Sequence, residues 1–101
     1  MRRAAKVDDN QKKIMQTLRR HGCTVSSTAS EGKGFPDLVV GHRGVNALVE
    51  VKDGSKKPSE QKLTKDQEKF HAEWDGWIVT IHNEEEAAFL VLEMRRRSKG
   101  L

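Results

Sequence analysis

The sequence predicts a small α/β domain built on a mixed sheet, with elements in the order α-β-β-β-α-β-α. Two apolar, β-branched runs at 38–40 and 48–51 are typical of neighbouring strands. Capping residues precede three segments whose apolar residues recur at helical spacing. The chain has 101 residues, of which 35% are hydrophobic and 34% charged, so it has room for one domain with a small core.

The first helix is predicted to begin after a capping residue at 8–10 and to run to about His21, because Gly22 is a helix terminator. Its apolar side chains Ile14, Met15 and Leu18 share one face. A short, fairly polar strand is expected at 24–27. The glycine-containing stretch 29–34 is expected to be a loop.

A hairpin turning around 41–44 is expected to join the next two strands. If Asp37 lies opposite Leu48, one face of the hairpin is uniformly apolar and belongs on the core; it comprises Leu38, Val40, Ala47, Val49 and Val51. Asp37, Glu50 and Lys52 then share the other face, with the two carboxylates in diagonal positions about 7–8 Å apart. A shift by one residue would place Asp37 among the core side chains.

The second half of the chain begins with a hydrophilic loop at 53–62. Thr64 and Gln67 fit a capping box that opens a helix to about Trp74, and a strand is expected at 77–81. Asn83 caps the last helix, whose first turn holds three glutamates at the positive end of the helix dipole. The predicted apolar face of this helix is Ala87, Ala88, Val91, Leu92 and Met94.

Charge and cysteine content restrict the classes of partner. A net charge of +4 favours a polyanionic partner, although basic charge can also serve solubility alone. We expect a basic arm at 1–7, one domain at 8–96 and a basic tail at 97–101. The single Cys23 excludes an internal disulfide and a cysteine-rich zinc site. No apolar run approaches membrane-spanning length, so a reducing cytoplasm is the expected location.

The charged face of the hairpin indicates metal-assisted phosphate chemistry. Burying an unpaired carboxylate costs several kcal/mol, so two carboxylates on strands need a compensating ion. Asp37 and Glu50 offer the hard oxygen ligands that Mg²⁺ and Mn²⁺ prefer, and Lys52 projects from the same face toward an anionic group. The alternative is a solvated hairpin face with an ordinary cross-strand ion pair.

The spacing Pro36-Asp37 … Glu50-Val51-Lys52 resembles the core motif of the PD-(D/E)XK nucleases. The flanking segments 34–41, 48–54 and 63–67 are similar to a VRR-Nuc domain, and this resemblance covers nearly the whole chain. It implies a restriction-endonuclease-like fold and Mg²⁺- or Mn²⁺-dependent cleavage of DNA. It further implies Holliday-junction substrates, a homodimer, and a recombination or repair role in a bacterial or phage-infected cytoplasm.

The resemblance also implies roles for further residues. The backbone carbonyl of Val51 would join Asp37 and Glu50 at the metal, and Gln67 would face the site, unless it only completes the capping box. Relatives often supply a glutamate from the first helix. This helix offers Asn10 and Gln11 but no glutamate. Gln11 is either a ligand, bound weakly or through water, or an exposed amide, and the loop residue Glu31 is another alternative.

Several basic and aromatic side chains are candidates for contact with DNA. Lys33 precedes the first acidic strand and His71 lies one turn beyond Gln67, but each could be an ordinary surface residue. The remaining cationic candidates are Arg2, Arg3, Lys56 and Lys57. The aromatic residues Phe70, Trp74 and Trp77 suggest either base stacking or, by position, core or dimer packing.

The leading function is therefore a metal-dependent, structure-selective endodeoxyribonuclease that acts on branched DNA. One alternative is a non-catalytic module that binds DNA or a protein partner on a nuclease scaffold. Another is a flap or single-strand nuclease of the same chemical class.

Overall fold

The computed structural model describes residues 8–28 and 30–100, and it has the predicted order of elements. The four strands form one sheet in the order β1-β2-β3-β4, in which β1, β2 and β3 are antiparallel and β4 runs parallel to β3. The elements are α1 (Asp9–Arg20), β1 (Thr24–Ser27), β2 (Leu38–His42), β3 (Val45–Val51), a 3₁₀ turn η1 (Pro58–Glu60), α2 (Lys65–Glu73), β4 (Ile78–Ile81) and α3 (Glu84–Ser98).

Local sequence signals explain the helix boundaries. Asp8, Thr64 and Asn83 each accept a hydrogen bond from the backbone N–H three residues later, which satisfies a donor that has no partner within the helix. At Thr64 the full capping box is formed, because Gln67 also accepts from the Thr64 backbone N–H. The helices therefore begin where the sequence predicts.

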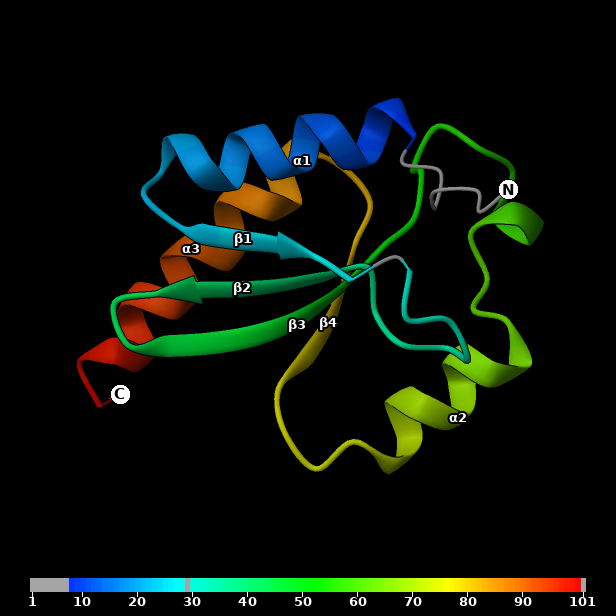
Figure 1. Ribbon diagram of the computed structural model, residues 1–101. Helices are drawn as coiled ribbons and strands as arrows, with labels where there is room; N and C mark the ends of the chain where they lie inside the picture. The colour runs from blue at the N-terminus through cyan, green and yellow to red at the C-terminus, as the bar shows by residue number, and fades with distance from the viewer. Residues whose placement is uncertain (1–7, 29, 101) are drawn as a thin grey trace.

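The core lies between one face of the sheet and the helices α1 and α3, which contact each other. Ile14 and Leu18 of α1 are fully buried against the predicted apolar face of the hairpin, where Leu38, Val40 and Val49 are also fully buried. The helix α2 lies apart from this layer, near the start of β2 (Figure 1). This arrangement confirms the mixed sheet and leaves the other face of the hairpin to α2 and its flanking loops.

The hairpin register differs from the expected one by two residues. Val40 pairs with Ala47 and His42 with Val45, so the turn consists of Arg43 and Gly44 alone. Both have positive φ, at 52° and 81°, as a two-residue turn that matches the strand twist requires. A shift of two residues preserves which side chains share a face, but it moves Asp37 toward a position directly across from Glu50. The expected diagonal placement was wrong.

The helix α3 buries a slightly different stripe from the predicted one. Leu90 is buried with Ala87, Val91 and Met94, whereas Leu92 is 59% exposed. The spacing of the buried residues is i, i+3, i+4, i+7, which is one continuous helix face. The helix also includes Arg97 and Ser98, which were expected in the basic tail, and the Arg97 guanidinium lies 3.6 Å from the centre of the Trp77 ring.

The aromatic residues divide into two groups. Trp77 is partly buried and packs against the core, as expected. Trp74 is 44% exposed and stacks on Phe70 outside the core, so core packing was the wrong assignment for it. None of the helices in residues 8–28 and 30–100 is long and apolar enough to cross a membrane.

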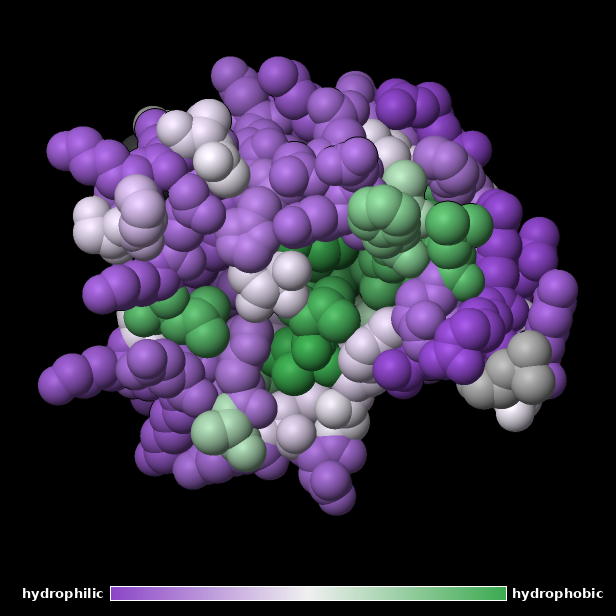
Figure 2. Space-filling view, turned by 180° about the vertical axis from the view of Figure 1, so that it is seen from behind, coloured by the Kyte–Doolittle hydropathy of each residue, from purple (hydrophilic) through white to green (hydrophobic). Residues whose placement is uncertain are grey.

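A groove of about 320 Å³ lies between the edge strand β4 and α3, and its apolar lining includes Val79, Ile81 and Phe89. Figure 2 shows the molecule from behind, where hydrophobic side chains gather in a hollow at the centre of the view. Phe89 is 61% exposed.

Candidate active site

The end of β3 and the start of β2 bring the two acidic side chains together. The Asp37 carboxylate accepts a hydrogen bond of 2.9 Å from the Val51 backbone N–H, which places it beside the last residues of β3. Glu50 is 1% exposed, although it carries a carboxyl group. Its Oε1 atom has no hydrogen-bond partner among the described residues, and a polar atom buried in this way is rare in folded proteins.

The carboxyl group of Asp37 affects the ionisation of Glu50. Burial, together with the nearby Asp37 carboxyl group, raises the pKa of Glu50 to about 8, and the Lys52 ammonium only partly opposes this. Two adjacent carboxylates cannot both ionise cheaply in a buried place without a cation between them. The orphaned oxygen and the hard-oxygen donors therefore fit a divalent cation such as Mg²⁺ or Mn²⁺.

Gln67 connects the acidic pair to the lysine. Its Oε1 accepts from the Lys52 Nζ at 2.8 Å, and its Nε2 donates to Glu50 Oε2 at 3.1 Å. The same Oε1 accepts from the Thr64 backbone N–H at 2.9 Å. A site-facing role and a capping role were treated as alternatives, yet one amide performs both because its oxygen has two lone pairs.

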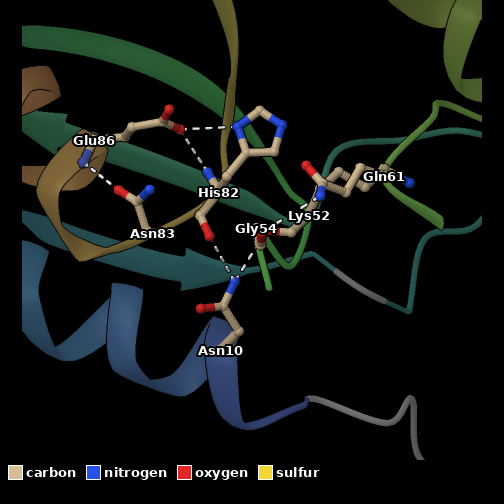
Figure 3. A network of polar contacts seen from close by, with 7 residues as sticks. All are labelled: Asn10, Lys52, Gly54, Gln61, His82, Asn83 and Glu86. Atoms are coloured by element: carbon tan, nitrogen blue, oxygen red, sulfur yellow. Dashed lines mark hydrogen bonds and ion pairs between the residues drawn. The ribbon is translucent and has the colours of Figure 1, made fainter. Parts of the chain in front are cut away.

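The strand end that carries Lys52 is fixed by α1 (Figure 3). The Asn10 side-chain amide donates to the Lys52 carbonyl at 2.9 Å and to the His82 carbonyl at 3.2 Å. His82 is in turn held by Glu86, whose carboxylate accepts from both its backbone N–H and its ring. The sequence did not assign Asn10 to the site. Its only signal was a polar residue in the first turn of a helix, which is also a common capping position.

The neighbouring Gln11 is 5% exposed and its Nε2 atom has no partner among the described residues. The expectation of an exposed, solubilising amide was therefore wrong. Glu31, the other residue considered as a metal ligand, is exposed in the loop before β2. Of these two candidates for a further ligand, Gln11 is the one with a buried side chain.

His71 lies on α2 one turn beyond Gln67. Its Nε2 atom is buried without a partner in the part of the chain that the structure describes. Burial and the positive charge of Lys52 both lower the pKa of His71, so the ring lies within electrostatic reach of the site lysine. His71 is partly buried, which fits the alternative of a partly packed histidine, and its contact with a phosphate stays a prediction.

The other basic candidates surround this site less closely. Lys33 is exposed on the loop before β2, with a positive φ of 53°. Lys56 and Lys57 are exposed in the loop that follows β3. Arg2 and Arg3 lie outside the described residues. Within the described part of the chain, no group of three or more His, Cys, Asp or Glu side chains is arranged to hold a metal, so a cation would depend on two carboxylates plus amide or backbone donors.

The mixed α+β fold, with its four-stranded mixed sheet and three helices, is consistent with that of VRR_NUC and other PD-(D/E)XK-like nuclease domains. A search of solved structures found a chain described as a VRR_NUC domain, with a TM-score of 0.55 and 29% sequence identity, covering 81% of this chain and 89% of that chain. The resemblance to VRR-Nuc domains is thereby confirmed. No protein-family model and no curated protein matched the chain.

Proposed function

We propose that this protein is a Mg²⁺- or Mn²⁺-dependent, structure-selective endodeoxyribonuclease that hydrolyses phosphodiester bonds in branched DNA, with four-way Holliday junctions as the substrate. One observation carries the proposal. Gln67 links Glu50 to Lys52, Asp37 is bound to the Val51 N–H at the end of the same strand, and the buried Glu50 carboxyl has an oxygen without a partner among the described residues. Such a group is costly to keep unless the working protein uses it.

Asp37, Glu50 and the Val51 carbonyl are the groups that would hold the cation, with Gln11 as an additional donor. When bound, Mg²⁺ or Mn²⁺ supplies Lewis-acid polarisation of the phosphate and lowers the pKa of a bound water. The donor set is made of hard oxygen atoms, which both ions accept.

The remaining chemistry belongs to Lys52 and its partner. Gln67 holds Lys52 Nζ in place at 2.8 Å, so the ammonium can orient the attacking water or neutralise charge on the phosphate as it reacts. In its neutral amine form, Lys52 could instead accept the proton of that water. The Gln67 amide also fixes one Glu50 oxygen, which leaves the other oxygen free for the cation.

Contacts with the DNA backbone complete the proposal. Lys33, Lys56, Lys57 and His71 lie on the loops and the helix around the site, and Arg2 and Arg3 precede α1 in the sequence. Phosphate contacts of this kind give an affinity that falls steeply with salt concentration. Selectivity would then depend on the shape of the branched substrate.

A homodimer is part of the same proposal, because two sites are needed to cut two opposed strands of a junction. The open apolar groove beside the edge strand β4 supports it, since a second copy would cover apolar surface that a domain of this size leaves exposed. The bacterial or phage-infected cytoplasm is the proposed location.

Cleavage of labelled DNA tests this function. We expect Mg²⁺ or Mn²⁺, but not a chelator, to support cutting of a fluorescent four-way junction in preference to a linear duplex, with size-exclusion mass measurement showing a dimer. If the protein binds these substrates but cuts none with either metal, the non-catalytic binding module is correct instead. Faster cutting of a flap than of the junction would favour the flap nuclease.

The Gln67→Ala variant is expected to lose both activity and stability. It removes the partner of Lys52 Nζ, one partner of Glu50 and half of the capping box. Loss of the cap costs about 1 kcal/mol, and loss of a group that orients site residues typically lowers activity about 10–100-fold. Single-turnover cleavage and thermal unfolding measure the two effects. Gln16→Ala, an exposed glutamine on α1, is the matched control, and equal rates in the two variants would contradict the role of Gln67.

A further inference from the structure

Three aromatic side chains form a continuous strip beside α2, outside the core. The Phe35 and Phe70 rings meet edge to face at 5.1 Å between centroids, and Phe70 stacks on Trp74 at 5.5 Å with an interplanar angle of 14°. Trp74 is 44% exposed. We call Phe35, Phe70 and Trp74 the aromatic strip. Its position on the surface indicates a use beyond core packing.

A cavity of about 380 Å³ opens against this strip. Its lining has one aromatic wall, Phe70, together with two cations and two carboxylates, namely Lys33, Lys69, Asp66 and Glu73. The volume is within the range of about 300–1,000 Å³ that is usual for small-molecule pockets. The two carboxylates would repel a phosphate placed inside the cavity. The lining therefore favours a flat, neutral, polar ring inside, with phosphates held by the lysines at the rim.

The cavity adjoins the proposed active site. The loop that carries Lys33 lies against the start of α2 (Figure 1) so closely that a Cβ atom on Gly34 would approach the Asp66 carbonyl oxygen to 2.3 Å. Asp66 directly precedes Gln67, which contacts Glu50 and Lys52. A DNA strand at the site would therefore pass beside the cavity within the next few nucleotides.

We propose that this cavity receives an unpaired nucleobase of the bound DNA, stacked against the aromatic strip, with Lys33 and Lys69 contacting the flanking phosphates. Every base has a π face that can stack on Phe70, and Asp66 and Glu73 can accept hydrogen bonds from a ring N–H, as in thymine, or from exocyclic amino groups. The inference rests on the proposed function, because DNA is the ligand, and it adds a substrate feature. Among junction substrates, the protein would then prefer one that has an unpaired nucleotide next to the bond that is cut.

A binding experiment without cleavage tests this inference separately from catalysis. The Trp77→Phe variant leaves Trp74 as the single tryptophan, and Ca²⁺ or a chelator replaces the active metals. The probes are a duplex with a short unpaired thymidine flap and the same duplex with abasic residues in the flap. We expect the thymidine flap to quench Trp74 fluorescence and to bind about tenfold more tightly than the abasic flap, as one stacked base would give.

Variants of the strip check that the effect arises there. In the Phe70→Leu variant, the ratio of the affinities for the thymidine flap and the abasic flap is expected to fall from about tenfold to about one. Trp74→Leu, at a more exposed position that contributes less to folding, is expected to reduce it. Leu92→Ala on α3 is the control, because this residue is 59% exposed, lies on another element and does not line the groove beside β4, and it should keep the full preference.

Equal binding of the two flaps by the parent protein, with unchanged Trp74 fluorescence, would overturn the inference and leave the nuclease proposal standing. A preference that persists in both Phe70→Leu and Trp74→Leu would overturn it as well. Failure to bind either DNA would remove the proposed function together with the inference.

Discussion

Replacing Glu50 with glutamine is expected to reduce DNA cleavage by a factor of about 10² to 10³ or more, because it removes a charged oxygen from the position that fits the cation. DNA binding should change little, since Glu50 is buried and offers no cation to the phosphates. Single-turnover cleavage and fluorescence anisotropy on the same four-way junction separate the two quantities. Cleavage at the parent rate would contradict the role of Glu50.

The same variant should make the metal-free protein more stable at alkaline pH. The pKa of Glu50 in the fold is about 8, against an ordinary value of 4.5, so the folded protein holds a proton that the unfolded chain releases between these values. The contribution of protonated Glu50 to the free energy of unfolding is therefore fully present below about pH 4.5, and it is lost as the pH rises through 8. Because glutamine cannot ionise, the stability of the Glu50→Gln variant should not fall in this way.

Thermal unfolding at pH 5 and pH 8.5 in a chelator measures this effect. We expect Glu50→Gln to be more stable than the parent by on the order of 1–3 kcal/mol at the higher pH and by much less at pH 5. Added Mg²⁺ should stabilise the parent protein but not the variant. The exposed Glu60→Gln serves as the matched control. If neither pH nor Mg²⁺ changes the unfolding temperature of the parent protein, this would argue against a buried, cation-binding carboxylate.

Gly34→Ala is expected to damage both the fold and the site. Gly34 has a φ of 81°, and a Cβ atom there would meet the Asp66 carbonyl oxygen at 2.3 Å and the Gln67 nitrogen at 2.9 Å. Both are backbone atoms and cannot rotate away, so the start of α2 must shift. The strain of a left-handed backbone conformation and the overpacking together should lower the free energy of unfolding by on the order of 2–4 kcal/mol. Displacing Gln67 should also lower the cleavage rate.

Gly44→Ala is the control for the backbone strain. Gly44 has the same φ of 81°, but nothing lies within 4 Å of its added Cβ atom. It should lose about 1–2 kcal/mol and keep its cleavage rate, because the hairpin turn lies at the other end of β2 and β3 from Asp37 and Glu50. Urea unfolding and single-turnover cleavage of both variants give the comparison. Equal losses of stability and of cleavage rate in Gly34→Ala and Gly44→Ala would show that the contact between residue 34 and α2 does not matter.

The shared face of Asp37, Glu50 and Lys52 followed from a period of two along each strand. A carboxylate or lysine at a position whose neighbours at i±2 form the core would lower the stability of the fold by a large amount. This cost fixes which side chains share a face, and a shift of two residues along the strand leaves that assignment unchanged. The register itself depended on the turn. Its two residues, Arg43 and Gly44, adopt positive φ, and the sequence around them also allowed a longer turn.

The site amides show a different limit. The motif at Thr64 and Gln67 predicted a capping box, and the strands predicted an acidic pair, but no local rule says that one side chain serves both. That depends on where α2 lies against β3. The bond from Asn10 to the Lys52 carbonyl joins residues 42 positions apart, so it also depends on how the helix packs.

The sequence alone determined the order of elements, the helix starts, the apolar face of the hairpin and the common face of Asp37, Glu50 and Lys52, because each follows from contacts within a few residues or from a strand's alternation. The tertiary structure alone decided that Glu50 is buried with a free oxygen, that Gln67 links it to Lys52, and that an aromatic strip lies beside them. Burial and pairing arise from segments far apart in the chain, and only packing brings those together.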